Sequence, residues 1–188
     1  MKSVLILASL SLLSAQEFRV GGRVAEFTVN DLQGQAISSS ALTGKVTVVV
    51  FLSTQCPVSN AYNERMEALF REFGDRVKFV FLNANSNESA SDIAAHSRAS
   101  GFSFPVYKDV NNVVADRFGA QSTPESYVLD AAGVMRYHGY IDDAQNLARI
   151  KNQGLKLAIG AVLEGREVAT AETKAFGCTI KRTRRTSR

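Results

Sequence analysis

The residue of this chain best suited to chemistry is Cys56, which lies in the segment Ser53-Thr54-Gln55-Cys56-Pro57-Val58-Ser59. A cysteine reacts as a thiolate, and the free amide hydrogens at the beginning of a helix stabilise that anion. Pro57 suits the first turn of a helix, where its missing N–H is not needed. We therefore predict that Cys56 is a nucleophile at a strand-to-helix junction. The competing interpretation is a small, buried, inert residue.

Cys178, near the C-terminus, is the second of the two cysteines in the chain. Three relationships to Cys56 are open: Cys178 resolves or exchanges a disulfide formed on Cys56, bonds to it permanently, or is unpaired or paired with another molecule. In the chain-entropy model, a permanent bond closing a loop of roughly 120 residues would stabilise the fold by about 4 to 5 kcal/mol. The sequence does not fix the distance between the two sulfur atoms.

The segments around Cys56 follow the order of an α/β fold. Residues 46–52 form an unbroken apolar, β-branched run, which is typical of a central strand covered on both faces. Apolar residues then recur every three or four positions, which predicts one helix from Pro57 to about Gly74. A buried strand over 77–82 and a helix over about 90–100 follow, so we expect a parallel sheet with right-handed crossovers.

Antiparallel hairpins are predicted on both sides of this unit, an N-terminal one over 25–39 and a second one over 126–138, each with a glycine in its turn. Apolar faces predict a short helix over 113–118 and a final helix over about 145–163. Asp142-Asp143 precede the final helix and are predicted to cap its beginning.

The two ends of the chain differ from its body. Residues 1–15 combine Lys2, a short apolar run and small residues up to Ala15, which predicts a cleaved signal peptide and an exported, periplasmic or extracytoplasmic, soluble protein. No later segment is apolar enough to cross a membrane. Five of the last eight residues are basic, and without them the net charge of +4 becomes −1. We interpret these residues as a solvated tail, and no basic stripe indicates nucleic-acid binding.

Several motifs resemble the thioredoxin-like superfamily, in particular its exported redoxin branch related to alkyl hydroperoxide reductase and thiol-specific antioxidant proteins (the AhpC/TSA type). The motifs are Glu26-Phe27-Thr28-Val29-Asn30-Asp31 with Gly34, Gly44-Lys45, Cys56-Pro57-Val58-Ser59-Asn60 and residues 119–124. Thr123-Pro124-Glu125, residues 137–143 and residues 177–182 resemble a bacterial subgroup of redoxin-domain, thiol-disulfide isomerase-like proteins. The resemblance covers most of the mature chain.

This resemblance implies a three-layer α/β fold, with a central mixed sheet flanked by helices and an N-terminal β-hairpin extension. It also implies redox chemistry on cysteine without a cofactor. We expect no metal site, because copper carriers of this fold resemble Cys-x-x-x-Cys, which is absent here. We expect a redoxin domain over 16–165, preceded by the signal peptide at 1–15 and followed by a C-terminal extension over 166–188 that carries Cys178 and the basic tail.

The resemblance further implies that Pro124 forms a cis peptide bond beside the sulfur of Cys56. Thr123 would then present its backbone to an extended partner chain by strand addition. Glu125 follows directly and has two interpretations: it tunes Cys56 or selects a partner, or it is an ion-paired strand residue.

Two departures from the family patterns affect the function. Thioredoxin-type reductants carry a second cysteine three residues after the first, but Ser59 stands there, so this loop holds no dithiol. Peroxiredoxins resemble Pro-x-x-x-Thr-x-x-Cys, whereas Val49 and Ser53 occupy those two places. The Ser53 hydroxyl is still a possible donor to a peroxide.

These observations favour an exported thiol-disulfide oxidoreductase or isomerase. In it, Cys56 attacks a protein disulfide or another oxidised sulfur, and Cys178 or an external thiol reductant resolves the mixed disulfide. The first alternative is a thiol peroxidase, in which peroxide oxidises Cys56 to a sulfenic acid that condenses with Cys178. The second is a non-catalytic binding module that holds a partner at the Thr123-Pro124 edge.

Overall fold

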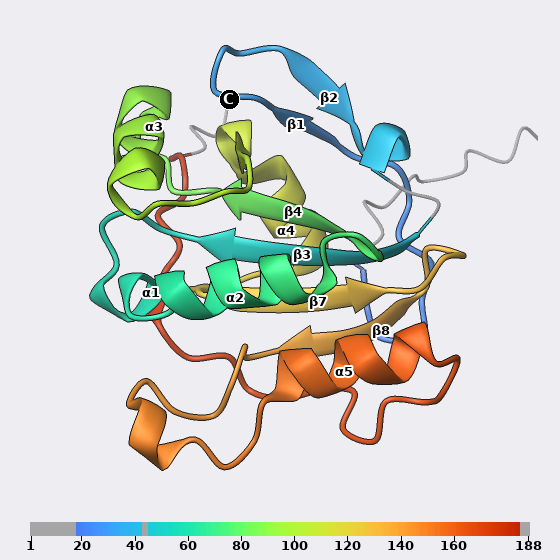
Figure 1. The fold of residues 1–188 in the computed structure, drawn as a ribbon. Helices are drawn as coiled ribbons and strands as arrows, with labels where there is room; N and C mark the ends of the chain where they lie inside the picture. The colour runs from blue at the N-terminus through green and yellow to red at the C-terminus, as the bar shows by residue number, and fades with distance from the viewer. Residues whose placement is uncertain (1–17, 43–44, 185–188) are drawn as a thin grey trace, which may run out of the picture.

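The computed structural model describes residues 18–42 and 45–184, so the predicted signal peptide lies outside the described residues. A seven-stranded mixed sheet with the strand order β2-β1-β5-β4-β3-β7-β8 forms the centre of the molecule. Helices cover both faces of this sheet (Figure 1). The predicted α/β fold with a central mixed sheet is confirmed.

The middle of the sheet consists of β3 (Val46–Leu52) and β4 (Val77–Asn83), which run parallel to each other. Every residue of β3 is buried, as the unbroken apolar run predicts for a strand with both faces covered. On its other side β3 pairs antiparallel with β7 (Glu125–Leu129), which pairs antiparallel with β8 (Met135–Gly139). β3 therefore ends, just before Cys56, in the interior of the sheet.

The remaining strands extend the sheet at one edge and form a small second sheet. β5 (Val106–Lys108) pairs parallel with β4, and the predicted N-terminal hairpin of β1 (Thr28–Asn30) and β2 (Ala36–Ser38) follows at the edge. The second sheet pairs β6 (Ser122–Thr123) antiparallel with β9 (Cys178–Thr179). No pattern in the sequence predicted β9.

Helices pack on the two faces of the sheet unequally. The α-helices are α1 (Pro57–Asn60), α2 (Asn63–Phe73), α3 (Ala90–Ala99), α4 (Val113–Phe118) and α5 (Gly154–Leu163). Short 3-10 turns occupy Ser39–Leu42, Val110–Asn112 and Leu147–Arg149. Apolar residues of α2, α3 and α5 share one core, and those of α4 belong to the core on the opposite face (Figure 1).

The single helix predicted from Pro57 to Gly74 is wrong, because a turn at residues 61 and 62 divides it into α1 and α2. At this turn the buried Tyr62 directs its hydroxyl to the Asp142 carboxylate at 3.1 Å. Arg65 places its guanidinium 3.8 Å from the centre of the Tyr62 ring and pairs with the same carboxylate at 2.7 Å. These long-range contacts, which periodicity cannot detect, fix the side chain of Tyr62 at the turn between the two helices.

The predicted final helix over 145–163 is correct only from Gly154 onward. Asp143 accepts a hydrogen bond from the Lys151 amide at 2.9 Å and donates its own amide to the Asn152 carbonyl oxygen at 3.0 Å, which closes the preceding residues into a loop. Asp142 and Asp143 therefore do not cap the helix. Gly154 is the first residue of α5, and a Cβ at this position would collide with the Tyr137 hydroxyl and the Tyr140 ring.

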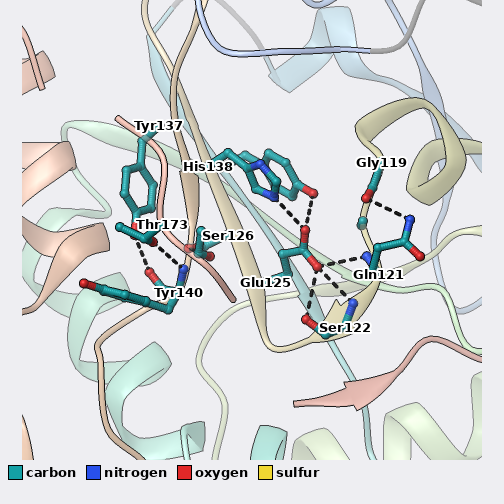
Figure 2. Close-up of polar contacts among 12 residues, drawn as sticks. Gly119, Gln121, Ser122, Glu125, Ser126, Tyr137, His138, Tyr140 and Thr173 are labelled. Carbon is teal, nitrogen blue, oxygen red and sulfur yellow. Dashed lines mark hydrogen bonds and ion pairs between the residues drawn. The ribbon is translucent and has the colours of Figure 1, made fainter. Parts of the chain in front are cut away.

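The chain after α5 returns to the sheet. Thr173 Oγ1 lies 2.8 Å from the Tyr137 hydroxyl and accepts from the Tyr140 amide at 3.1 Å (Figure 2). Further on, Ile180 is 3% exposed and belongs to the core on the α4 side. In the part of the chain that the structure describes, no helix combines the length and apolarity needed to span a bilayer.

Phe118, at the end of α4, is the centre of the core on that face. Its ring lies edge-on to Phe18, Phe27, Phe51 and Tyr127, with centroid separations of 4.9 to 6.0 Å. Edge-to-face aromatic pairs add to the stability gained by burial.

The substitution Phe118→Ala should lower the free energy of unfolding by about 3 to 5 kcal/mol, because it removes this ring and leaves a cavity. Val113→Ala on the same helix is the control, since Val113 is 51% exposed and such surface changes stay within about 0.5 kcal/mol. Urea unfolding of the oxidised protein measures both values. Similar losses for the two variants would contradict this description of the core.

Candidate active site

Cys56 lies between the end of β3 and the start of α1, as predicted, and its side chain caps the helix. The Ser59 amide donates to Cys56 Sγ at 3.3 Å, and the Thr123 carbonyl oxygen lies 3.3 Å from the same sulfur. The residue is only 3% exposed. An amide hydrogen directed at sulfur favours the thiolate over the thiol whenever Cys56 is reduced. Pro57 occupies the first helical position, as expected.

Cys56 and Cys178 form a disulfide bond across a sequence separation of 122 residues, with their Cα atoms 5.8 Å apart. This separation is within the range that disulfide geometry requires. Of the three relationships that the sequence left open, the structure therefore has an intramolecular bond. No free cysteine occurs among the residues described.

The peptide bond between Thr123 and Pro124 is cis, as expected. Thr123 pairs antiparallel with Cys178, and Ser122 pairs with Thr179. Gly177 makes this approach possible, because a Cβ there would collide with the Thr123 carbonyl group. The structure thus brings Cys56, Cys178 and the cis-proline turn to one place, at the carboxyl end of β3.

Ser59 stands where a thioredoxin-type reductant has its second cysteine, and it is completely buried. Its hydroxyl oxygen accepts from the Ser53 amide at 3.0 Å, which closes the loop around Cys56. Ser59 therefore supports this loop in two ways, through its hydroxyl and through the amide directed at Cys56 Sγ.

Glu88 supports the same loop, and we did not predict it. Its carboxylate, 2% exposed, accepts from Ser53 Oγ at 2.5 Å and from the Thr54 amide and hydroxyl at 2.7 and 2.8 Å. Asn83 Nδ2 also donates to it, at 2.5 Å. Burial works to raise the pKa of Glu88, but these hydrogen bonds outweigh it and hold the pKa below its usual value. The only available signal was a carboxylate in the Asn-rich stretch after β4.

The hydroxyl of Ser53 is fully engaged in this arrangement. It donates to Glu88 and accepts from the Cys56 amide at 3.0 Å and the Gln55 amide at 3.2 Å. Its single hydrogen therefore points to a carboxylate. Donation to a peroxide, the role that Ser53 has in the peroxidase interpretation, would break the hydrogen bond to Glu88.

Glu125, the first residue of β7, is a second buried carboxylate, and Figure 2 shows its polar contacts. It accepts from the amides of Gln121 and Ser122, each at 2.9 Å, from the Tyr127 hydroxyl at 2.8 Å, and lies 2.7 Å from His138 Nε2. Burial works to raise the pKa of Glu125, but the bonds from His138, Tyr127 and the two amides lower it to about 2. Among the described residues these are its partners, and Cys56 is not one of them.

Glu125 therefore holds the turn that leads into Thr123 and Pro124 rather than touching the sulfur. Of the two interpretations of the sequence, its contacts are nearer to those of a strand residue held by polar partners, His138 among them, than to a residue that tunes Cys56 directly. No group of three or more His, Cys, Asp or Glu side chains in the described ranges could hold a metal ion.

Proteins with similar sequences include some that are named thiol-disulfide oxidoreductase or thioredoxin-like protein. The chain is 28% identical over 122 residues to the thiol-disulfide oxidoreductase ResA of Halalkalibacterium halodurans, which covers 64% of this chain and 68% of ResA. It is also 28% identical to the thioredoxin-like protein YneN of Bacillus subtilis, over 62% of this chain and 68% of YneN.

Among solved structures, a hypothetical protein of Sinorhizobium meliloti is 29% identical, with a TM-score of 0.79 over 89% of this chain and 97% of that one. An uncharacterised protein of Geobacillus kaustophilus, 24% identical, has a TM-score of 0.82 over 90% and 95% of the two chains and shares the fold.

The sequence profile of the AhpC/TSA family matches residues 20–138. This range is more than half of the chain and includes Cys56, Thr123, Pro124 and Glu125, whereas Cys178 lies beyond it. The chain therefore belongs to the AhpC/TSA family, within the thioredoxin-like redoxin superfamily.

Proposed function

We propose that this protein is an exported thiol-disulfide oxidoreductase in which Cys56 is the nucleophile and Cys178 the resolving cysteine. The observation that carries the proposal is the disulfide between Cys56, at the start of α1, and Cys178, on the strand that pairs with Thr123. The relatives named as thiol-disulfide oxidoreductase and thioredoxin-like protein support the same class of reaction.

The reaction starts from the reduced protein. The Cys56 thiolate attacks one sulfur of a substrate disulfide, the bond between the substrate sulfurs breaks, and the second substrate sulfur leaves as a thiolate. Cys178, as a thiolate, then attacks Cys56 Sγ, so that the substrate is released with both cysteines reduced. The product on the protein is the bond between Cys56 and Cys178, and an external thiol reductant returns two electrons to it.

Cys56 is the better nucleophile of the pair because its sulfur accepts the Ser59 amide and its loop is fixed in place. Ser53 and Thr54 hold this loop through Glu88, and Ser59 closes it. Since Ser59 has no thiol, a mixed disulfide on Cys56 persists until Cys178 or an external thiol arrives. A persistent mixed disulfide also suits disulfide isomerisation.

Export is part of this proposal. The first 15 residues have the composition of a secretory signal, and an intramolecular disulfide of this kind is stable in an oxidising compartment. The substrates are accordingly protein disulfides outside the cytoplasm.

Substitution of the two cysteines should have different effects. We expect Cys56→Ser to lose the acceleration that the protein gives to reduction of a disulfide-containing model protein by dithiothreitol, leaving only the uncatalysed rate, because the thiol at the start of α1 makes the first attack on the substrate. We expect Cys178→Ser to retain the first attack and to accumulate a mixed disulfide on Cys56, detected as an adduct by mass spectrometry. Circular dichroism of each variant checks that it is folded.

Three results would contradict the proposal. Unchanged activity in Cys56→Ser would exclude Cys56 as the nucleophile, and retained partner binding without disulfide chemistry would favour the binding module. Rapid peroxide consumption by the wild type, with a sulfenic acid on Cys56 trapped by dimedone, would favour the peroxidase.

The turn before Pro124 should depend on pH through Glu125. A carboxyl whose pKa falls from 4.5 to about 2 on folding contributes about 3 kcal/mol of stability at neutral pH. Because the pKa is lowered in the folded state, this contribution is present above pH 4.5 and is lost as the pH falls toward 2. We therefore expect Glu125→Gln to be strongly destabilised at pH 7, and the difference from the wild type to be clearly smaller at pH 3 and to disappear as the pH falls toward 2.

Urea unfolding across this pH range measures the difference. Glu164→Gln, at a largely exposed carboxylate that pairs with Arg166, is the matched control and should follow the wild type at every pH. A stability difference for Glu125→Gln that stays constant from pH 7 to 3 would show that the Glu125 charge is not what holds the turn.

A further inference from the structure

The residues around Cys178 are bound to the site as an added strand. We call residues 177–183 the C-terminal segment. Its β9 part pairs antiparallel with β6, and the Ile180 amide continues the pairing by donating to the Gln121 carbonyl oxygen at 2.9 Å. This is the geometry of strand addition at an open edge.

The other side of the C-terminal segment is also bound. Lys181 donates its amide to Asn85 Oδ1 at 2.8 Å and accepts from the Ser86 amide at 2.8 Å. The Thr183 amide donates to Asn112 Oδ1, also at 2.8 Å. Main-chain contacts of this kind accept any extended polypeptide and therefore carry little sequence preference.

Side chains of the C-terminal segment alternate between two environments, as in a strand with one buried face. Thr179 and Lys181 are exposed, whereas Cys178, Ile180 and Arg182 point inward. Ile180 is 3% exposed and packs in the core on the α4 side.

Arg182 meets a different environment at the third inward position. Its Nε pairs with Asp116 Oδ1 at 2.9 Å, and its Nη2 donates to the Ala120 carbonyl oxygen at 2.6 Å. The edge thus offers three successive sites, for a cysteine, an aliphatic side chain and an arginine.

A substrate cysteine must come to the place that Cys178 now holds. Cys56 is almost completely buried, and Thr123 closes one side of its sulfur at 3.3 Å. A disulfide to Cys56 requires the partner Cα to lie within about 7 Å of the Cys56 Cα. Cys178 satisfies this at 5.8 Å, from the strand that pairs with Thr123.

We propose that the C-terminal segment is an internal substitute for substrate, and that the substrates are extended polypeptides with a disulfide-bonded cysteine, an aliphatic residue two positions later and an arginine four positions later. This inference rests on the proposed function and specifies its substrates. The segment and the substrate use the same edge in turn. Reduction of the bond between Cys56 and Cys178 frees the edge, and the attack of Cys178 on the mixed disulfide restores the segment as the reduced substrate leaves.

The test uses the full-length, reduced Cys178→Ser protein and two peptides. One peptide has the sequence of residues 176–183, and in the other Asp replaces the isoleucine and Glu replaces the arginine. Each peptide cysteine is activated as a 2-pyridyl disulfide. Attack by the Cys56 thiolate on the peptide sulfur joins peptide to protein and expels pyridine-2-thione, whose absorbance gives the rate. We expect the first peptide to react about tenfold faster or more.

A charge reversal tests the arginine site separately. In the same background, Asp116→Arg should reverse the preference between a peptide with Arg and one with Glu at the fourth position after cysteine. Glu72→Arg makes the same charge change on α2, where Glu72 pairs with Lys156, and should leave the preference unchanged. Hydroxyethyl disulfide, which has no side chains for the edge to select, should react in the Glu72→Arg variant at the rate of the Cys178→Ser background, and in the Asp116→Arg variant it reports whether Cys56 is still reactive.

The outcomes separate this inference from the proposed function. Equal rates for all peptides, with normal rates for hydroxyethyl disulfide, would overturn the substrate preference and leave the oxidoreductase standing. Failure of Cys56 to react with any disulfide would overturn both.

Discussion

The antiparallel contact between Thr123 and Cys178 is the interaction on which the site depends. It joins two short strands far apart in sequence and places the Cys178 sulfur against Cys56, which comes from a third segment. A contact between distant segments costs conformational entropy, because it closes a long loop. The sheet holds two of these segments in position, since β3 ends shortly before Cys56 and β7 begins directly after Pro124.

Two buried carboxylates fix the segments that meet at this contact. Glu88 holds the loop before Cys56, and Glu125 holds the turn before Thr123. Burying a carboxylate is unfavourable unless it is well hydrogen-bonded, and in both cases the hydrogen bonds to the carboxylate lower its pKa in spite of burial. The two carboxylates therefore hold backbone amides in place. Each affects Cys56 Sγ only indirectly, through the loop or turn that it supports.

Sequence patterns predicted the elements whose residues alternate or recur regularly. The strand over 46–52 and the helix over 113–118 were predicted with the observed bounds, because burial on both faces or on one stripe leaves a local signal. The turn between α1 and α2 accompanies a contact of Tyr62 with Asp142, 80 residues away, and such a contact leaves no local signal in the sequence. The role of Glu88 could not be predicted because its partners lie on other segments. The strand β9 could not be predicted because it is too short to show a periodicity.

The position of Cys178 on a paired strand, instead of in the loop of Cys56, changes what the redox reaction does to the structure. In a two-cysteine loop the disulfide opens and closes within one turn of helix, whereas here the bond holds a strand on an edge. Ser59 keeps the loop rigid in place of a second thiol. Buried hydrogen bonds thus fix the loop of Cys56. Forming or breaking the disulfide instead attaches or releases the strand that carries Cys178, which is the part that we propose a substrate replaces.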